Sequence, residues 1–126
     1  MLLNLKTLSN VSFAIPFVLA VLFKIYFMIF FIGLAMIVSL IYHVHDERRL
    51  QKMDMVAAFT LIGANLFLCY LFGFAFPYFH LALLFVIFAV YFYIKQNRYN
   101  YNLNHSLWHL SSVLITTFCI LGYAAK

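Results

Sequence analysis

The stretch VSFAIPFVLAVLFKIYFMIFFIGLAMIVSLIYH, residues 11–43, decides the fold class. An α-helix rises 1.5 Å per residue, so one helix over these residues would be about 50 Å long, well beyond the thickness of a bilayer core. Lys24 stands near its middle, where a charge is costly in lipid but tolerated at an interfacial turn. We therefore predict two short helices, 5–23 and 25–43, that meet at Lys24. The alternative is a first segment lying in the interface, which would leave four spanning helices.

The composition of the whole chain agrees with a membrane protein. Hydrophobic residues make up 67% of the 126 residues and charged residues 9%, whereas a soluble domain is roughly half apolar and one-quarter charged. The excess apolar surface must face lipid, where every backbone group needs a partner within the protein. Long apolar runs, rather than short alternating segments, favour helices over a barrel. The sequence predicts a single all-α integral membrane domain over residues 1–126.

The remaining spans are divided by three breaks. Polar segments at 46–52 and 95–102 predict loops, and a Gly/Pro-containing stretch at 73–77 predicts a turn. Between and beyond these breaks, residues 54–77, 78–94 and 103–125 are long enough to span a bilayer. The result is a bundle of five transmembrane helices, or four in the interfacial alternative.

The ends of three predicted helices fall on one membrane face. The second helix ends at His43, the third starts at Asp54, and two helices separate Asp54 from His105. Five basic residues flank this face, so the positive-inside rule predicts that it is cytoplasmic. They are Arg48, Arg49, Lys52, Lys95 and Arg98. The net charge of +5 lies in such short clusters rather than on a broad basic face, which argues against nucleic-acid binding.

Three histidines near this face have the spacing of a metal site. His105 and His109 are four residues apart, so both project from one side of a helix. His43 lies at the same depth on another helix and can complete three nitrogens. Three protein ligands and an open water position are typical of catalytic zinc, which lowers the pKa of its bound water towards 7. The alternative is a pair of interfacial histidines solvated by lipid headgroups.

Two further polar residues are candidates for catalysis. Asp54 is expected at the start of its helix, where it can take a proton from the zinc-bound water or orient that water. Ser39 is one turn deeper than His43 and can hydrogen-bond the water or a substrate carbonyl. Ionisable groups within the membrane are expensive, and their usual explanation is function.

This constellation resembles the CREST superfamily, which includes alkaline ceramidases, progestin and adiponectin receptors, and post-GPI-attachment lipid-remodelling proteins. The matching pattern is Ser39-x-x-x-His43, then Asp54, then His105-x-x-x-His109. The resemblance implies that the three histidines bind Zn²⁺ and that Asp54 and Ser39 lie beside the zinc-bound water.

The local sequence is similar to the post-GPI-attachment and myomaker branch. The similar segments are SLIYHVHD at 39–46, NHSLWH at 104–109, and the Pro16 to Tyr26 stretch before them. The superfamily core has seven helices, but the residues between Asp54 and His105 suffice for two helices rather than four. The expected lipid cavity is therefore more open to lipid, or is closed by a second subunit of a homo-oligomer. The N-terminal acidic cluster of the ceramidases has no counterpart, which argues against a ceramidase proper.

The expected function is a zinc-dependent, membrane-embedded lipid hydrolase that cleaves an amide or ester of a membrane lipid. The alternative is a non-enzymatic, zinc-stabilised receptor or a membrane-remodelling, fusion-type protein. A haem protein is disfavoured, because His105 and His109 compete for one side of a ring. Cys69 and Cys119 lie in apolar runs and suggest neither a disulfide framework nor a thiolate metal site. Asn65 is interpreted as an interhelical hydrogen-bonding residue.

Overall fold

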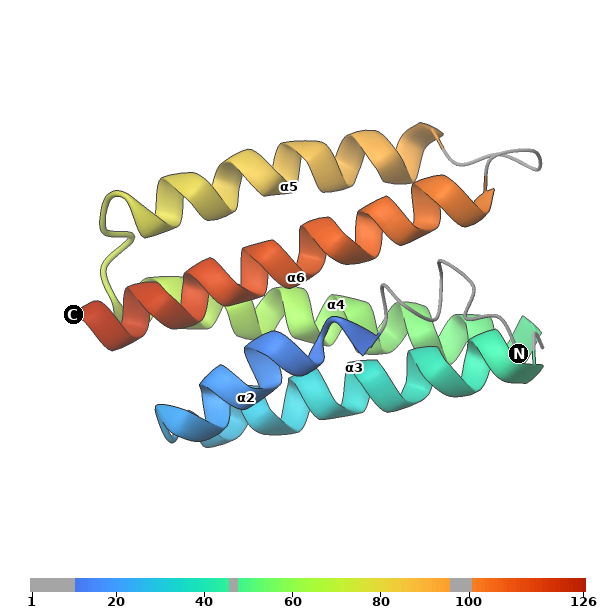
Figure 1. Ribbon diagram of the computed structural model, residues 1–126, viewed down its shortest axis with the longest axis horizontal. Coiled ribbons are helices and arrows are strands. Elements are labelled where there is room, and N and C mark those ends of the chain that lie inside the picture. Colours follow the sequence, from blue (N-terminus) through green and yellow to red (C-terminus); the bar gives the residue numbers. More distant parts are fainter. Residues whose placement is uncertain (1–10, 46–47, 96–100) are drawn as a thin grey trace.

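The computed structural model describes residues 11–45, 48–95 and 101–126, which form five α-helices (Figure 1). The predicted all-α fold class is confirmed. In chain order the helices are α2 (Ala14–Leu22), α3 (Tyr26–His45), α4 (Arg48–Leu71), α5 (Tyr78–Lys95) and α6 (Tyr101–Ala125).

Helix α6 is the centre of the bundle. It packs against α2, α4 and α5, while α3 packs against α2 and α4. In Figure 1, α5 and the α2–α3 pair lie on opposite sides of α6. Because α5 packs mainly against α6, the consecutive helices α4 and α5 stand apart along the described parts of the chain. This separation determines the shape of the site described below.

The break at Lys24 is confirmed. Lys24 has φ +58° and is exposed, and it separates α2 from α3. The N–H of Ile25 donates to the carbonyl of Ala20 at 2.9 Å, and the N–H of Lys24 donates to that of Val21 at 3.2 Å. This pair of hydrogen bonds around a left-handed residue is the Schellman motif, which satisfies the last carbonyls of a helix.

The predicted break at 73–77 is confirmed and has the same geometry. Gly73 has φ +70°, and the N–H of Phe74 donates to the carbonyl of Cys69 at 3.0 Å. A glycine adopts this left-handed conformation without steric cost. Helix α4 therefore ends at Leu71, and the chain turns back into α5 at Tyr78.

Three predicted boundaries near the polar face are wrong. Helix α3 continues past His43 to His45, α4 begins at Arg48 rather than at Asp54, and α6 begins at Tyr101. Residues 48–53 contain good helix formers and neither Gly nor Pro, so nothing in this polar segment prevents a helix. The first predicted helix, 5–23, is described only from residue 11, and its helical part is α2.

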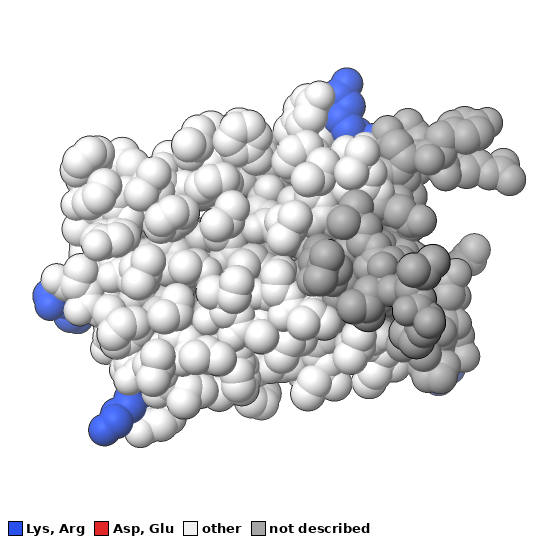
Figure 2. Space-filling model, viewed as in Figure 1, with Lys and Arg blue, Asp and Glu red and all other residues white. Residues whose placement is uncertain are grey.

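Within the described residues, three helices are long and apolar enough to cross a membrane: Lys52–Leu71, Tyr78–Lys95 and Leu103–Ala125. The apolar part of α3, Tyr26–Tyr42, is slightly shorter. Many large apolar side chains on these helices are exposed. In Figure 2 the Lys and Arg side chains lie at the two ends of the molecule and leave the middle of the visible face uncharged. These features are consistent with a multi-pass membrane protein.

Close packing of α4 on α6 depends on Gly122. A Cβ atom built at Gly122 would lie 2.6 Å from the ring of Phe72, whose side chain is buried. Gly63, on α4, has nothing within 4 Å of such an atom. Small residues at helix interfaces allow this close approach in membrane bundles.

Gly122→Ala is expected to destabilise the bundle by about 1–3 kcal/mol, because the Phe72 ring has to move within a packed interface. Gly63→Ala is the matched control and should be neutral or stabilising, since Ala favours a helix over Gly. Thermal unfolding of the detergent-solubilised variants measures both. Equal stability of the two variants would contradict the packing described here.

Candidate functional site

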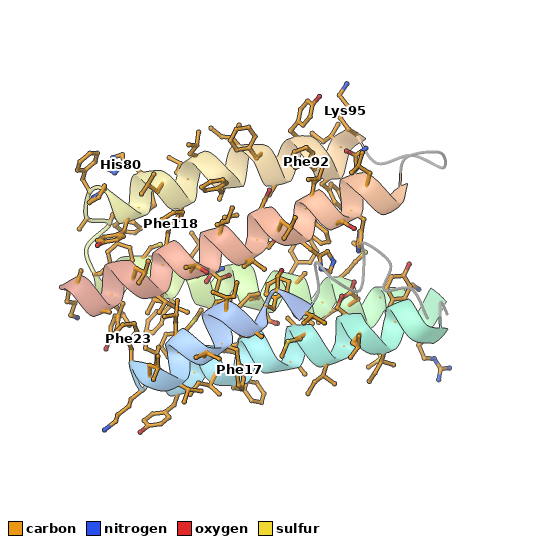
Figure 3. The ribbon with its side chains drawn as sticks, in the orientation of Figure 1. Phe17, Phe23, His80, Phe92, Lys95 and Phe118 are labelled. Atoms are coloured by element: carbon orange, nitrogen blue, oxygen red, sulfur yellow. The ribbon has the colours of Figure 1, made fainter. Side chains whose placement is uncertain are left out.

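The three helix ends predicted to share one face do lie at the same end of the bundle. The C-terminal end of α3 and the N-terminal ends of α4 and α6 are together on the right of Figure 1. Lys95, at the C-terminal end of α5, lies at this same end in Figure 3, whereas His80 lies at the opposite end of α5. The order of the helices along the chain therefore correctly predicted at which end of the bundle each of these polar residues lies.

His105 and His109 meet through their imidazole rings. Their Nε2 atoms are 3.0 Å apart and their ring centroids 4.5 Å apart. Both side chains are 5% exposed although they lie in the first turns of α6. The four-residue spacing on one helix face brings the rings together, as predicted.

Aromatic residues hold this histidine pair in place. The Trp108 ring lies 5.3 Å from that of His105 and 5.4 Å from that of His109, centroid to centroid. The Phe13 ring, just before α2, packs edge-on against His109 at 5.9 Å. These contacts leave each imidazole few alternative orientations.

Ser39 and Asp54 are buried side by side in the cavity that His109 also lines. Ser39 on α3 is 3% exposed and Asp54 on α4 is 8% exposed. The two side chains are neighbours, and both line the cavity that His109 also lines. Asp54 stands in the second turn of α4 rather than at its start, because α4 begins at Arg48.

The third predicted ligand lies in the last turns of α3, where the backbone of His43 is helical. The side chain of His43 is outside the described residues. Among the side chains that are described, no group of three His, Cys, Asp or Glu residues is close enough to hold a metal ion. The three-histidine zinc site thus remains a prediction, for which the structure places two of the three rings.

A cavity of about 570 Å³ extends from these residues along α6. This volume falls within the range of small-molecule sites. Ser39, Asp54 and His109 line it, and so do Cys69 and Cys119, far along α4 and α6. Asp54 and Cys69 are separated by roughly 22 Å along a helix axis. We call it the lateral cavity.

The lateral cavity opens between α4 and α5. Its lining includes exposed apolar side chains on both of these helices, which therefore form the rims of an opening rather than a closed wall. On a membrane-spanning bundle such an opening faces lipid. The exposed lining residues include Phe59, Ile62, Leu66, Leu83, Val90 and Tyr93.

Deeper in the bundle, one interhelical contact is confirmed and one is unexpected. Asn65 Nδ2 donates to Thr116 Oγ1 at 3.1 Å, which is the hydrogen bond predicted for Asn65. Cys69 Sγ and Cys119 Sγ lie 3.3 Å apart as buried thiols, a contact that was not predicted from the sequence.

A signal for the cysteine contact was present in the sequence. Since α4 and α6 start at the same end and run parallel, residues at equal offsets from Asp54 and His105 lie at equal depth. Asn65 and Thr116 have equal offsets in this sense, and the offsets of the two cysteines differ by one residue.

No protein-family model, curated protein or solved structure matches this chain. Its own residues define an all-α bundle whose long apolar helices are consistent with a multi-pass membrane protein. Asp54 and His109, one member of the buried histidine pair, line its laterally open cavity.

Proposed function

We propose that this protein is a zinc-dependent, membrane-embedded hydrolase that cleaves an amide or ester bond of a membrane lipid. Its main support is the contact between the His105 and His109 rings at the end of the bundle where Ser39, Asp54 and His109 line an apolar cavity that opens sideways. The resemblance of these residues to the CREST pattern supports the same reaction class.

The histidine pair fits a zinc ion. Two nitrogens bound to one tetrahedral zinc at roughly 2.0–2.1 Å lie about 3.3 Å apart. The Nε2 atoms of His105 and His109 are 3.0 Å apart, so a small adjustment of the rings accommodates the ion. His43, from the last turns of α3, is the proposed third nitrogen. When bound, zinc supplies a Lewis acid that polarises a carbonyl group and acidifies water.

The lateral cavity fits one hydrocarbon chain of a lipid. Apolar side chains dominate its lining, and three of its polar residues, Ser39, Asp54 and His109, come from the same end of the bundle, whereas Asn65 lies deeper. A lipid that enters between α4 and α5 would place its chain along α6 and its headgroup linkage beside Asp54. Each buried methylene contributes about 0.8 kcal/mol relative to water, although exchange with bilayer lipid recovers much less.

The polar residues have distinct proposed roles. The Asp54 carboxylate accepts a proton from the attacking water and returns it to the leaving nitrogen or oxygen. The Ser39 hydroxyl donates a hydrogen bond to the carbonyl oxygen as charge develops there. Trp108 and Phe13 keep the histidine rings oriented.

The proposed orientation places this end of the bundle in the cytoplasm. The basic residues that flank it, Lys52 and Lys95 among them, outnumber those at the opposite end, where Lys24 and Lys126 lie. This is the distribution that the positive-inside rule associates with a cytoplasmic face.

Metal analysis combined with a lipid-hydrolysis screen tests the proposal. The purified protein should contain about one zinc per chain. Removal of zinc with a chelator should abolish hydrolysis of at least one lipid class, and added zinc should restore it. Ceramides, phospholipids and acyl esters labelled in the acyl chain provide a suitable panel.

Two outcomes would contradict the proposal. Undiminished hydrolysis by the chelated protein would exclude a role for zinc in the reaction. A zinc-loaded protein that hydrolyses none of the lipids would instead favour a structural zinc in a receptor or membrane-remodelling protein.

A further inference from the structure

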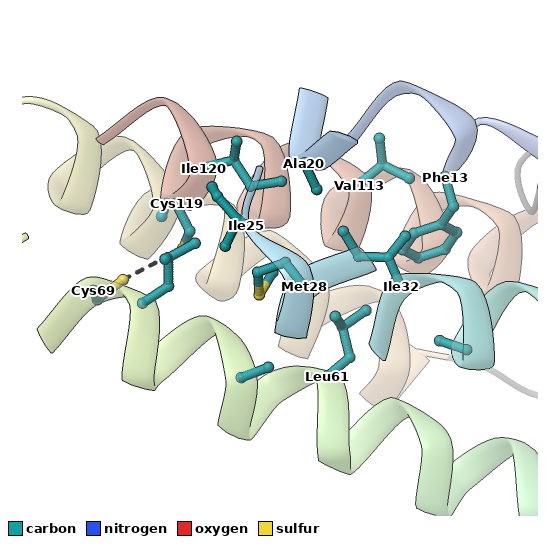
Figure 4. Close-up of a cluster of buried hydrophobic side chains, with 14 of the residues drawn as sticks. Phe13, Ala20, Ile25, Met28, Ile32, Leu61, Cys69, Val113, Cys119 and Ile120 are labelled. Carbon is teal, nitrogen blue, oxygen red and sulfur yellow. Dashed lines mark hydrogen bonds between the residues drawn. The ribbon is translucent and has the colours of Figure 1, made fainter. Parts of the chain in front are cut away.

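The two cysteines form a contact at the end of the bundle away from the histidines. Figure 4 shows Cys69 on α4 and Cys119 on α6 reaching toward each other beside Ile25 and Ile120. Their sulfur atoms are 3.3 Å apart, and the side chains are 4% and 1% exposed. The chain contains two cysteines in all, so this is the one intramolecular thiol pair that it can form.

The surrounding packing holds the two thiols in position. Three residues beyond them, the ring of Phe72, directly after α4, fits against Gly122 on α6. At the ends of the same helices, Lys126 Nζ donates to the carbonyl of Leu71 at 3.1 Å. Contacts beyond the two cysteines therefore hold α4 against α6, and this packing keeps the two thiols close together.

Conversion to a disulfide would need only a small movement. The S–S bond is about 2.05 Å long, so the sulfur atoms must approach by roughly 1.3 Å from their present separation of 3.3 Å. Rotations about the two Cα–Cβ bonds and a slight shift of α4 toward α6 can provide this movement.

We propose that Cys69 and Cys119 are a redox-responsive modification site, at which a peroxide oxidises the two thiols to a disulfide that ties α4 to α6. The first thiol, as thiolate, attacks the peroxide O–O bond, forming a sulfenic acid and releasing water or an alcohol. The second sulfur then displaces the sulfenic oxygen, which leaves as water while the S–S bond forms. Two thiols lose two protons and two electrons, and one peroxide is reduced.

The lateral cavity gives the oxidant a route to this site. Both cysteines line the cavity, so a small peroxide in the membrane or the cavity can reach them although little of either side chain is exposed. The proposed orientation places this end of the bundle on the non-cytoplasmic side, where disulfides persist. The modification does not depend on zinc or on lipid hydrolysis.

Controlled oxidation of the full chain in detergent micelles tests the proposal. The protein is treated with hydrogen peroxide, quenched, and then alkylated with N-ethylmaleimide after unfolding in dodecyl sulfate. Wild type is expected to lose both alkylation sites while remaining a monomer on a non-reducing gel, and to regain both after reduction. The rate should not depend on protein concentration, because the reaction is intramolecular. Oxidation should also raise the apparent Tm of wild type by several degrees, because the crosslink opposes separation of α4 from α6.

Two single variants serve as matched controls. Cys69→Ala and Cys119→Ala each keep one thiol, so neither can form the intramolecular disulfide, and neither should gain thermal stability on oxidation. If one variant fails to fold, the other still provides the comparison. Retention of both alkylatable thiols in oxidised wild type, or formation of interchain dimers alone, would overturn the proposal. Because the readouts are mass and Tm, neither result bears on whether the protein hydrolyses lipids.

Discussion

Asp54→Asn is expected to abolish lipid hydrolysis while leaving the zinc content unchanged. Asn has nearly the same shape as Asp but cannot carry a proton between water and the leaving group. General acid–base catalysis contributes roughly 10²–10⁴-fold, so kcat should fall by about that factor. Asp54 is buried against Ser39 and lines the lateral cavity, which is the position that this role requires.

The measurement is kcat with a hydrolysed lipid at saturating zinc, together with zinc content and Tm. Thr60→Val is a suitable control on the same helix, because the Thr60 hydroxyl donates only to the Ala57 carbonyl, at 2.7 Å, and Thr60 is not among the lining residues. It should hydrolyse lipid at the wild-type rate. If Asp54→Asn also does so, Asp54 is not the proton carrier.

The helices and their breaks could be predicted from the sequence because each depends on a local property. The run at 11–43 is too long for one span, and Lys24 is the residue in it that lipid excludes most strongly. Gly73 permits the left-handed conformation that ends α4. The start of α4 could not be predicted so closely. Residues 48–53 are polar, but polarity at a membrane surface does not distinguish a loop from the exposed first turns of a helix.

The grouping of the site residues was also predictable, because it depends only on the number of membrane crossings. Two helices between Asp54 and His105 return the chain to the same end of the bundle, whatever the exact helix bounds. The four-residue spacing then suffices to bring the rings of His105 and His109 together. For these residues, the sequence therefore predicted both the end of the bundle and the shared helix face.

The lateral cavity could not be predicted from the sequence. It exists because α5 packs on α6 and stands apart from α4. No residue pattern in α4 or α5 predicts this separation. A more open cavity was expected only because the chain between Asp54 and His105 is short. The contact between Cys69 and Cys119 depends on the relative rotation of α4 and α6. The similar depth of the two cysteines makes such a contact feasible. The apolar residues around them do not indicate how α4 and α6 are rotated relative to each other.

His105→Ala and His109→Ala are each expected to lose stoichiometric zinc. Removing one of the three proposed ligands leaves an incomplete coordination shell, and even outer-shell changes weaken zinc binding by 10–100-fold. We therefore expect zinc affinity to fall by at least about 100-fold in either variant. Competition with a chromophoric zinc chelator measures this affinity in detergent, without any need to know the substrate.

His80→Ala is the matched control. His80 is exposed at the other end of α5, with its ring against Phe76 and Phe79, and should not affect zinc binding (Figure 3). Zinc should raise the Tm of wild type and His80→Ala but not that of the two ligand variants, because an ion that binds only the folded state stabilises it. This comparison separates loss of a ligand from a general loss of packing at α6. If His105→Ala and His109→Ala keep wild-type zinc affinity, the close Nε2 contact is a hydrogen bond between neutral imidazoles and the zinc proposal fails.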